Sequence, residues 1–377
     1  MEVTKENLEE RFKREWESYK QENKRTFLPN ILIAGASGAG KSSLINTIFG
    51  KAEAKVSSVK PETQGFHVYY GKDYGRTVNL IDSAGYETNQ AETYYDDLSK
   101  AIREGVDGHP THIAWYSISI ANKRVEDFDI NTLEKLMQET ELRGRMCVVF
   151  TKCDYDDEDS TTANAFRKTI TEKLQKRNVP TRNLKFFETC SDPKLDLQLR
   201  ELMEWSANSL DDSDLRRCFV AAQRANLDLK REEALNVIKI AAAGAGVIGA
   251  APIPYADAPF LIAAQVKMAD SILDIYDLSS FANLSKEAVA QLVVAQAGKA
   301  VAARLLKMVP GVGTVIGGLI TGAVATTLTT ALGLAISEIC YRSIDNTLKG
   351  IAVEWNHIFD ADIIKEMMKK KENQKMS

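Results

Sequence analysis

A glycine-rich turn that leads into a lysine and a serine is the first group of residues in this chain that could do chemistry. The turn spans residues 35–40, and Lys41 and Ser42 follow it. Glycines let backbone N–H groups approach phosphate oxygens closely, while the lysine can reach the β- and γ-phosphates of a nucleotide. The serine hydroxyl can ligate Mg²⁺. This G-x-x-x-x-G-K-S pattern predicts a phosphate loop whose binding residues are Gly35, Ser37, Gly38, Ala39, Gly40, Lys41, Ser42 and Ser43.

The segments on either side of this turn are those that a phosphate loop needs. Residues 31–34 are apolar and predict a short buried strand, and residues 42–49 predict a helix. The N-terminus of such a helix carries partial positive charge that favours phosphate. A chance glycine-rich turn is the alternative, but it would need neither the strand before it nor the helix after it, so the context favours the phosphate loop.

A second motif, Asp-Ser-Ala-Gly at residues 82–85, could complete the phosphate site. An apolar run at residues 77–81 predicts the strand that leads to it, and this run forms a predicted hairpin with residues 66–70. We expect Asp82 to hold the Mg²⁺ shell and the Gly85 N–H to contact the γ-phosphate. The turn would then sense whether the third phosphate is present.

The loop predicted at residues 51–65 should supply a second sensor of the third phosphate. Thr63 lies there within Pro-Glu-Thr-Gln-Gly. Its hydroxyl could bind Mg²⁺, while its backbone N–H meets the γ-phosphate. An ordinary loop threonine is the alternative, because turns favour this residue type too. The predicted metal ligands are Ser42, Thr63 and Asp82, and the predicted catalytic residues are Lys41, Thr63 and Gly85.

Two further motifs could select the base of the nucleotide. A strand predicted at residues 146–150 ends in Thr-Lys-Cys-Asp, and one at 184–187 leads to Glu-Thr-Cys-Ser. The Asp154 carboxylate can accept hydrogen bonds from N1–H and the exocyclic amino group of guanine, which adenine does not offer together. The Lys152 stem can lie along the base. The predicted base-side residues are Thr151, Lys152, Asp154, Thr189, Cys190 and Ser191.

The remaining patterns of the first half predict the scaffold that positions these motifs. Residues 112–120 are almost continuously apolar, which favours a central parallel strand that is buried on both faces. Helical patterns occur around Leu98 and Ile102, over residues 128–137 and over residues 165–176. We therefore expect an α/β fold with a mostly parallel sheet flanked by helices.

In this order and spacing, the motifs GASGAGKS, Thr63, DSAG, TKCD and ETCS resemble those of the GTPase superfamily. They are similar to Era-like bacterial GTPases in the TrmE–Era–septin–dynamin-like group, over about residues 28–210. The resemblance implies a P-loop GTPase domain that binds GTP with Mg²⁺ and hydrolyses it to GDP and phosphate as a nucleotide-dependent switch. The fifth motif of many relatives reads Ser-Ala-Lys, which Thr189-Cys190-Ser191 only approximates.

The residue after Asp-Ser-Ala-Gly departs from Ras-like relatives. Tyr86 stands where a glutamine orients the attacking water in those relatives. The resemblance is thus to a class with a hydrophobic residue at this position, which implies slow hydrolysis or activation by a partner, by dimerisation or by another residue. A homodimer through this domain stays open. A binding module with negligible turnover is an alternative function.

The second half reads as an all-helical domain, expected at residues 213–362. Residues 240–256 and 308–337 contain no charged side chain. About 20 apolar residues can span a bilayer, so membrane contact through these segments competes with burial in a compact bundle. Their high content of Thr, Gly and Ala favours the bundle, because the gain on transfer to lipid is small. The segments IPIPYADAP and VPGVGTVIGG resemble a helical domain of unknown function found after bacterial Era-like GTPase domains.

The two ends of the chain have distinct patterns. Residues 1–27 predict an amphipathic helix, whose stripe of Leu8, Phe12, Trp16 and Tyr19 docks on the protein's own core or on a partner. Residues 363–377 are rich in lysine and are expected to form a basic, disordered tail.

Composition narrows the function classes. The net charge of −4 gives no indication of a nucleic-acid partner. Five dispersed cysteines without metal-type spacing, and no signal-peptide pattern, suggest a cytoplasmic protein, with membrane association left open.

The main alternative to a GTPase switch is a dynamin-like or immunity-related mechanochemical GTPase that acts on membranes.

Overall fold

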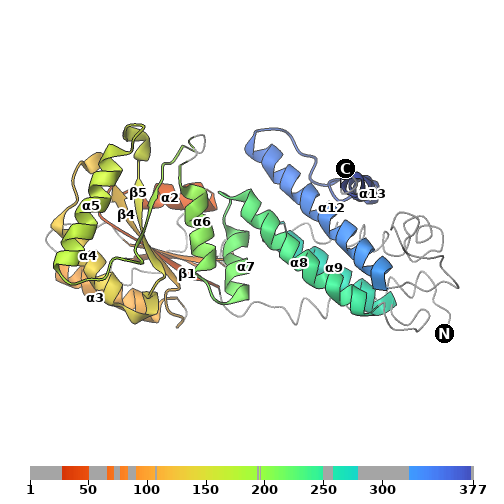
Figure 1. The fold of residues 1–377 in the computed structure, drawn as a ribbon, viewed down its shortest axis with the longest axis horizontal. Helices are drawn as coiled ribbons and strands as arrows, with labels where there is room; N and C mark the ends of the chain where they lie inside the picture. The colour runs from red at the N-terminus through yellow and green to blue at the C-terminus, as the bar shows by residue number, and fades with distance from the viewer. Residues whose placement is uncertain are drawn as a thin grey trace. The chain divides into compact units, whose positions relative to one another are not determined.

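The structure is a computed structural model in which the chain divides into two compact units, Phe27–Asn226 and a unit that contains Leu227–Ser377. Figure 1 shows the elements of each unit. The structure describes residues 28–50, 66–71, 77–83, 91–106, 108–192, 195, 197–248, 258–278 and 322–374. The predicted N-terminal helix at residues 1–27 lies outside this described part.

The first unit is built on a mostly parallel sheet, as expected from the sequence. In the described residues it has six strands in the order β2-β3-β1-β4-β5-β6, and only β2 runs antiparallel, through its pairing with β3. The hairpin predicted between residues 66–70 and 77–81 is thus confirmed. The strands are β1 (Asn30–Ala34), β2 (Phe66–Tyr69), β3 (Asn79–Ser83), β4 (Ile113–Ser119), β5 (Met146–Thr151) and β6 (Lys185–Glu188).

Helices cover both faces of this sheet (Figure 1). On one face, apolar side chains of α3, α4 and α5 form a core with every second residue of β1, β4 and β5. On the other, Trp115 of β4 stacks on Phe49 of α2, and Phe219 of α7 meets both rings edge-on. The helices are α2 (Lys41–Phe49), α3 (Ala91–Glu104), α4 (Asp127–Gln138), α5 (Thr161–Lys176), α6 (Leu199–Asn208) and α7 (Ser213–Ala222), with short turns η2 (Ile120–Asn122), η3 (Thr140–Leu142) and η4 (Cys153–Tyr155).

Helix α7 belongs to the first unit, whereas the sequence predicts that the helical domain begins at residue 213. Phe219 is fully buried, and its ring lies 6.4 Å from both Phe49 and Trp115. Thr77 also donates a hydrogen bond to the carbonyl of Cys218 at 2.6 Å. These contacts are distant in sequence, so the local pattern of α7 could not indicate which unit it joins.

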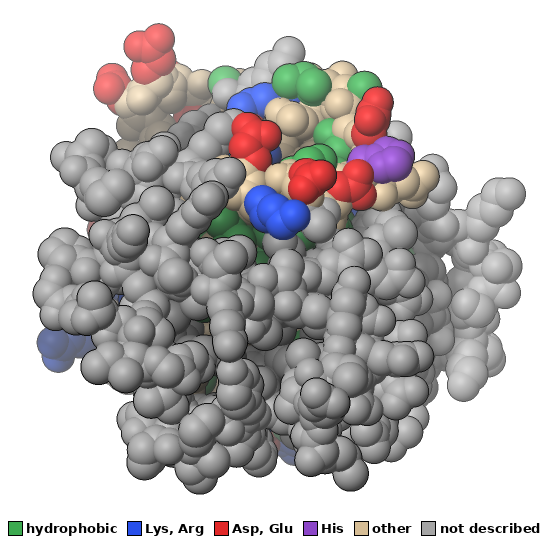
Figure 2. Space-filling view, turned by 90° about the vertical axis from the view of Figure 1, so that its right-hand side faces the viewer, with side chains coloured by type: hydrophobic (Ala, Val, Ile, Leu, Met, Phe, Trp, Pro, Cys, Tyr) green, Lys and Arg blue, Asp and Glu red, His purple; other side chains and the backbone are tan. Residues whose placement is uncertain are grey.

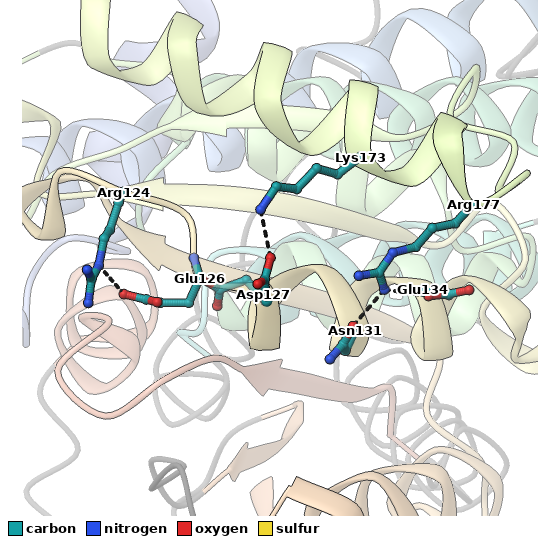
Figure 3. A network of polar contacts seen from close by, with 8 residues as sticks. Arg124, Glu126, Asp127, Asn131, Glu134, Lys173 and Arg177 are labelled. Atoms are coloured by element: carbon teal, nitrogen blue, oxygen red, sulfur yellow. Dashed lines mark hydrogen bonds and ion pairs between the residues drawn. The ribbon is translucent and has the colours of Figure 1, made fainter.

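Helices α4 and α5 are joined on their solvent side by a polar network (Figure 3). Lys173 pairs with Asp127 at 2.7 Å, and Arg177 donates to Glu134 at 2.8 Å and to Asn131 at 2.6 Å. Exposed pairs of this kind contribute little stability, about 0–1 kcal/mol each. They connect the exposed sides of the two helices, whose apolar sides pack in the core.

The second unit is helical in its described part. Its helices are α8 (Leu227–Ile248), α9 (Ala258–Ile275), α12 (Gly322–Leu348) and α13 (Ala361–Gln374), of which α8, α9 and α12 pack against one another (Figure 1). Gly333 of α12 lets the helices approach closely, because a Cβ there would lie 2.6 Å from Ile238 Cγ1 and 2.8 Å from Met268 Sδ. A residue with a side chain at this position would therefore push the helices apart.

The uncharged segments fall partly within these helices. Residues 240–248 lie in α8 and residues 322–337 in α12, while 249–256 and 308–321 lie outside the described residues. Leu332, Ala335 and Ile336 of α12 are completely buried in the unit. In the part of the chain that the structure describes, no helix combines the length and hydropathy needed to cross a membrane.

Helix α13 corrects the expectation of a disordered tail from residue 363, because the chain is helical as far as Gln374. Ile364 and Met368, four residues apart, are buried and give the helix an apolar side. The abundance of lysine in this segment makes that spacing hard to see in the sequence.

On the face shown in Figure 2, described acidic and basic side chains lie beside one another.

Candidate functional site

The phosphate loop connects β1 to α2 in the backbone conformation that its glycines permit. Gly35 has φ +142° and Gly40 has φ +80°, which residues with a side chain rarely adopt. A Cβ on Gly35 would lie 2.3 Å from the carbonyl oxygen of Ser117 on β4. A Cβ on Gly40 would lie 3.1 Å from Thr151 Oγ1 on β5. Both positions therefore require glycine if the loop is to lie against the sheet edge.

Lys41 opens α2 and folds its side chain over this loop. Its Nζ donates to the carbonyl oxygens of Gly35 and Ala36, each at 3.0 Å, and the residue is buried. Burial lowers the pKa of Lys41, and the charge of nearby Asp82 opposes that shift. The ammonium group is thus held at the loop by weak carbonyl acceptors, which phosphate oxygens could replace with stronger charge-assisted bonds.

Two of the predicted metal ligands come together beside the lysine. Ser42 Oγ donates to Asp82 Oδ2 at 3.3 Å. The other carboxylate oxygen, Asp82 Oδ1, is buried and has no hydrogen-bond partner among the described residues. Burial raises the pKa of Asp82, while Lys41, Ser42 and His67 lower it. A hydroxyl and an under-coordinated carboxylate form the oxygen donor set that a hard cation such as Mg²⁺ prefers.

The first base motif is tied directly to the phosphate loop. Thr151 Oγ1 donates to the carbonyl of Ala39 at 2.7 Å, and Lys152 Nζ donates to that of Gly38 at 3.0 Å. Lys152 has φ +58°, a left-handed conformation that turns the chain sharply at the end of β5. These bonds fix the spacing between the loop that would hold phosphates and the loop that would hold a base.

The second base motif lies against the first. The Cys153 N–H donates to the carbonyl of Thr189 at 3.1 Å, and Thr189 donates to the carbonyl of Phe150 through its N–H and its hydroxyl. Burial raises the pKa of Cys153 to about 12. Burial raises the pKa of Cys190 as well, and the nearby Asp154 carboxylate adds to that effect. Both thiols therefore favour their protonated form.

The functional groups of the site face outward from this framework. The bonds of Thr151 and Thr189 to the backbone are buried, yet several residues that would touch a ligand are exposed: Ser37, Gly38, Ser42, Ser43, Asp154 and Ser191. Thr63, Gly85 and Tyr86 lie outside the described residues, so their roles remain predictions.

Sequence reasoning missed Tyr94, on the first turn of α3. Its hydroxyl donates to Ser83 Oγ at 3.4 Å and also forms a hydrogen bond with the backbone of Gly35. Tyrosines in the helix that follows Asp-Ser-Ala-Gly were the available signal, because that helix begins near the sheet edge where the phosphate loop lies. Their contact with the loop depends on helix packing, which the local pattern does not reveal.

Comparison with known proteins agrees with this geometry. Residues 30–152 match the family described as 50S ribosome-binding GTPase. The chain is 27% identical over 157 residues to GTPase Der of Prochlorococcus marinus, covering 38% of this chain and 31% of Der. It is 27% identical over 163 residues to a probable GTP-binding protein EngB of Helicobacter hepaticus, covering 40% of this chain and 70% of EngB.

Other matches are shorter or more distant. Translocase of chloroplast 108 of Physcomitrium patens is 34% identical over 83 residues, which cover 22% of this chain and 8% of the translocase. The chain thus spans less than a third of that translocase and of Der. Among solved structures, LeoA, a bacterial dynamin GTPase from ETEC, aligns over 98% of this chain and 94% of its own at 11% identity and a TM-score of 0.37. The family match over residues 30–152 agrees with the expected fold, a mostly parallel sheet flanked by helices that carries a phosphate loop, and further helices follow this sheet in the chain.

Proposed function

We propose that this protein binds GTP with Mg²⁺, hydrolyses it to GDP and phosphate, and acts as a nucleotide-dependent switch. The observation that carries the proposal is the direct linkage of the two loops. Thr151 and Lys152 of the base motif donate to the carbonyls of Ala39 and Gly38 in the phosphate loop. A ligand with a base at one end and phosphates at the other therefore meets groups held at a fixed spacing.

At the phosphate end, Lys41 supplies positive charge and the loop supplies backbone N–H groups. Ser42 and Asp82 would hold Mg²⁺, which neutralises charge on the phosphate oxygens during transfer. The unpaired Asp82 Oδ1 supports this role, because a buried carboxylate oxygen without a partner is costly unless a ligand satisfies it. Thr63 and Gly85 would sense the γ-phosphate, and its release would free them.

At the base end, Asp154 would select guanine. Its side chain is exposed beside Cys190, where the two base loops meet. A carboxylate there accepts two hydrogen bonds from guanine and none of matching geometry from adenine.

Hydrolysis would be slow without help, because Tyr86 replaces the water-orienting glutamine of Ras-like proteins. Activation by a second copy through the GTPase domain is the simplest source of the missing group. The domain would be Era-like, in a cytoplasmic protein whose helical unit responds to the switch. A membrane-acting, dynamin-like role is the alternative, and hydrolysis with and without liposomes separates the two.

The test is hydrolysis of GTP and ATP by the full chain and by Asp154→Ala. We expect the wild type to prefer GTP and the variant to lose that preference. Glu158→Ala is the matched control, since Glu158 is another exposed acidic residue of the same loop. Equal use of both nucleotides by the wild type, or indifference to Asp154→Ala, would overturn the proposal. Rates that rise with protein concentration would support activation by dimerisation.

A further inference from the structure

Tyr94 connects the two strand ends on which the phosphate site is built. Its hydroxyl donates to Ser83 Oγ at the end of β3, at 3.4 Å, and it bonds with the backbone of Gly35, directly after β1. The strands are parallel neighbours, paired in register from Asn30 with Asn79 as far as Ile33 with Asp82. The phenol therefore joins them just beyond their last paired residues.

Each residue that Tyr94 contacts is linked to a group of the site. Ser83 directly follows Asp82, whose Oδ2 accepts from Ser42. The carbonyl oxygen of Gly35 accepts from Lys41 Nζ at 3.0 Å. A shift of the phenol would therefore alter both the carboxylate that would hold Mg²⁺ and the backbone that holds the lysine.

The ring of Tyr94 is held in place by aromatic packing between α3 and α4. Its centroid lies 5.4 Å from that of Phe128 and 6.3 Å from that of Tyr95, and Tyr95 stacks on Phe128 at 5.6 Å. Phe128 itself is buried. A side chain whose ring is packed on several sides has little rotamer freedom, which is what a positioning residue needs.

The phenol also keeps its proton. Burial raises the pKa of Tyr94 to about 12, even though its bonds with Ser83 and Gly35 lower it. At neutral pH the group is therefore a fixed donor to one strand end.

We propose that Tyr94 is a positioning residue that sets the spacing between the phosphate loop and the end of β3, so that Lys41, Ser42 and Asp82 reach a Mg²⁺-bound nucleotide together. The inference rests on the proposed function. Small displacements of catalytic groups have large effects on rate, on the order of 100-fold for about 1 Å. A hydroxyl that joins the two supporting strands thus influences catalysis without touching the nucleotide.

Tyr94→Phe tests the proposal, because it removes the hydroxyl and keeps the ring. We expect kcat for GTP to fall about tenfold and the Mg²⁺ concentration for half-maximal rate to rise several-fold. Tyr95→Phe is the matched control on the same helix, and its kcat and Mg²⁺ requirement should stay within about twofold of wild type. If Tyr94→Phe lowers only the melting temperature, with kcat and Mg²⁺ requirement unchanged, Tyr94 is a packing residue and the proposal is wrong.

A double-mutant cycle with Ser83→Ala gives a second, independent result. If Tyr94 acts through Ser83, the double variant loses no more activity than the more impaired single variant. Fully additive losses would contradict that route. A wild-type chain that binds no guanine nucleotide would overturn the proposed function itself, and that failure is visible before any variant is made.

Discussion

The carboxyl edge of the sheet in the first unit and the interior of the helical second unit both contain buried polar side chains, and they use them differently. In the second unit these groups satisfy one another. Lys230 Nζ donates to the carbonyl of Ile275 at 2.8 Å, Gln265 donates to Thr329 at 3.2 Å, and Tyr276 bonds to Ser337 at 3.1 Å across helices. Such pairing offsets the free-energy cost of burying polar groups and specifies how the helices align.

In the first unit some buried polar atoms are left without a partner. Among the described residues, the buried side-chain nitrogen and oxygen atoms without a hydrogen bond all lie there: Asp82 Oδ1, Tyr95 Oη, Ser117 Oγ, Ser119 Oγ and Arg167 Nε. Three of them lie on the strands that support the phosphate site, Asp82 on β3 and Ser117 and Ser119 on β4, while Tyr95 is on α3 and Arg167 on α5. Unpaired buried groups are uncommon in folded proteins and mark places that a ligand, ion or water completes. The contrast separates a region built to bind from a region built to pack.

The largest expected effect is that of Lys41→Ala. Removing the charge that Lys41 brings to the phosphates should lower GTP hydrolysis by about 100- to 1,000-fold, the usual effect of losing one group that stabilises transition-state charge. Steady-state phosphate release measures it. Lys173→Ala, which breaks only an exposed ion pair with Asp127, should leave the rate unchanged. Comparable losses in the two variants would remove the distinction between the binding edge and the rest of the surface.

Asp82→Asn should separate stability from activity. An acid whose pKa is higher in the folded chain stabilises the fold at low pH, and this contribution is lost as the pH rises through that pKa. Burial raises the pKa of Asp82, so the ionised carboxylate opposes folding at neutral pH when Mg²⁺ is absent.

We therefore expect Asp82→Asn to melt higher than the wild type at neutral pH without Mg²⁺, and to hydrolyse GTP at least about tenfold more slowly with it. Melting curves across pH, with and without Mg²⁺ and GTP, measure both effects. A variant that melts lower than the wild type at neutral pH without Mg²⁺ would show that Asp82 is already satisfied within the fold.

Gly333→Val tests the packed region. The new side chain would overlap Ile238 and Met268, and overpacking typically costs about 1–3 kcal/mol. Gly244→Ala is the control, because a Cβ there has no heavy atom within 4 Å and alanine favours helix. Thermal unfolding should show the first variant destabilised and the second slightly stabilised, with GTP hydrolysis nearly unchanged in both. Suppose that Gly333→Val lost most of its GTP hydrolysis at a temperature where it is folded. That result would show that packing in the helical unit also controls the nucleotide site.

Thr151→Val should have the smallest effect. It removes the buried hydrogen bond from Oγ1 to the Ala39 carbonyl and keeps the side-chain shape, so about 1 kcal/mol of stability is at stake. GTP affinity should weaken several-fold, because the phosphate loop loses one tie to the base loop. Thr169→Val on α5 is the control. Calorimetric titration measures the GTP affinity of both variants. An affinity unchanged in Thr151→Val would mean that Lys152 alone holds the two loops together.

Much of the site could be predicted because its chemistry is local. The glycines, Lys41 and Ser42 are consecutive, and the Asp82 and Asp154 motifs each follow directly on a strand that is apolar in sequence. What the sequence could not show depends on packing between distant segments. The contacts of Tyr94 with Ser83 and Gly35 require α3 to lie on one face of the sheet, and α7 joins the first unit through Phe219.

The helical half was harder to interpret for a different reason. Stretches rich in Ala, Gly and Thr fit either lipid or a close helix crossing, and the contacts of Gly333 and the bond between Gln265 and Thr329 show the crossing of α12. In α13, the many lysines favoured a disordered tail, because only two apolar residues, Ile364 and Met368, are buried and indicate a docked helix.

The most direct test of the nucleotide site exchanges the base that Asp154 would recognise. Asparagine at this position offers an N–H donor where aspartate offers an acceptor, which suits the second carbonyl of xanthine in place of the amino group of guanine. The quantity to measure is kcat/KM for GTP and for xanthosine triphosphate, in the wild type and in Asp154→Asn. We expect the preference to reverse, by at least about tenfold in each direction. An unchanged preference would contradict the assignment of this edge of the sheet as a guanine-nucleotide site.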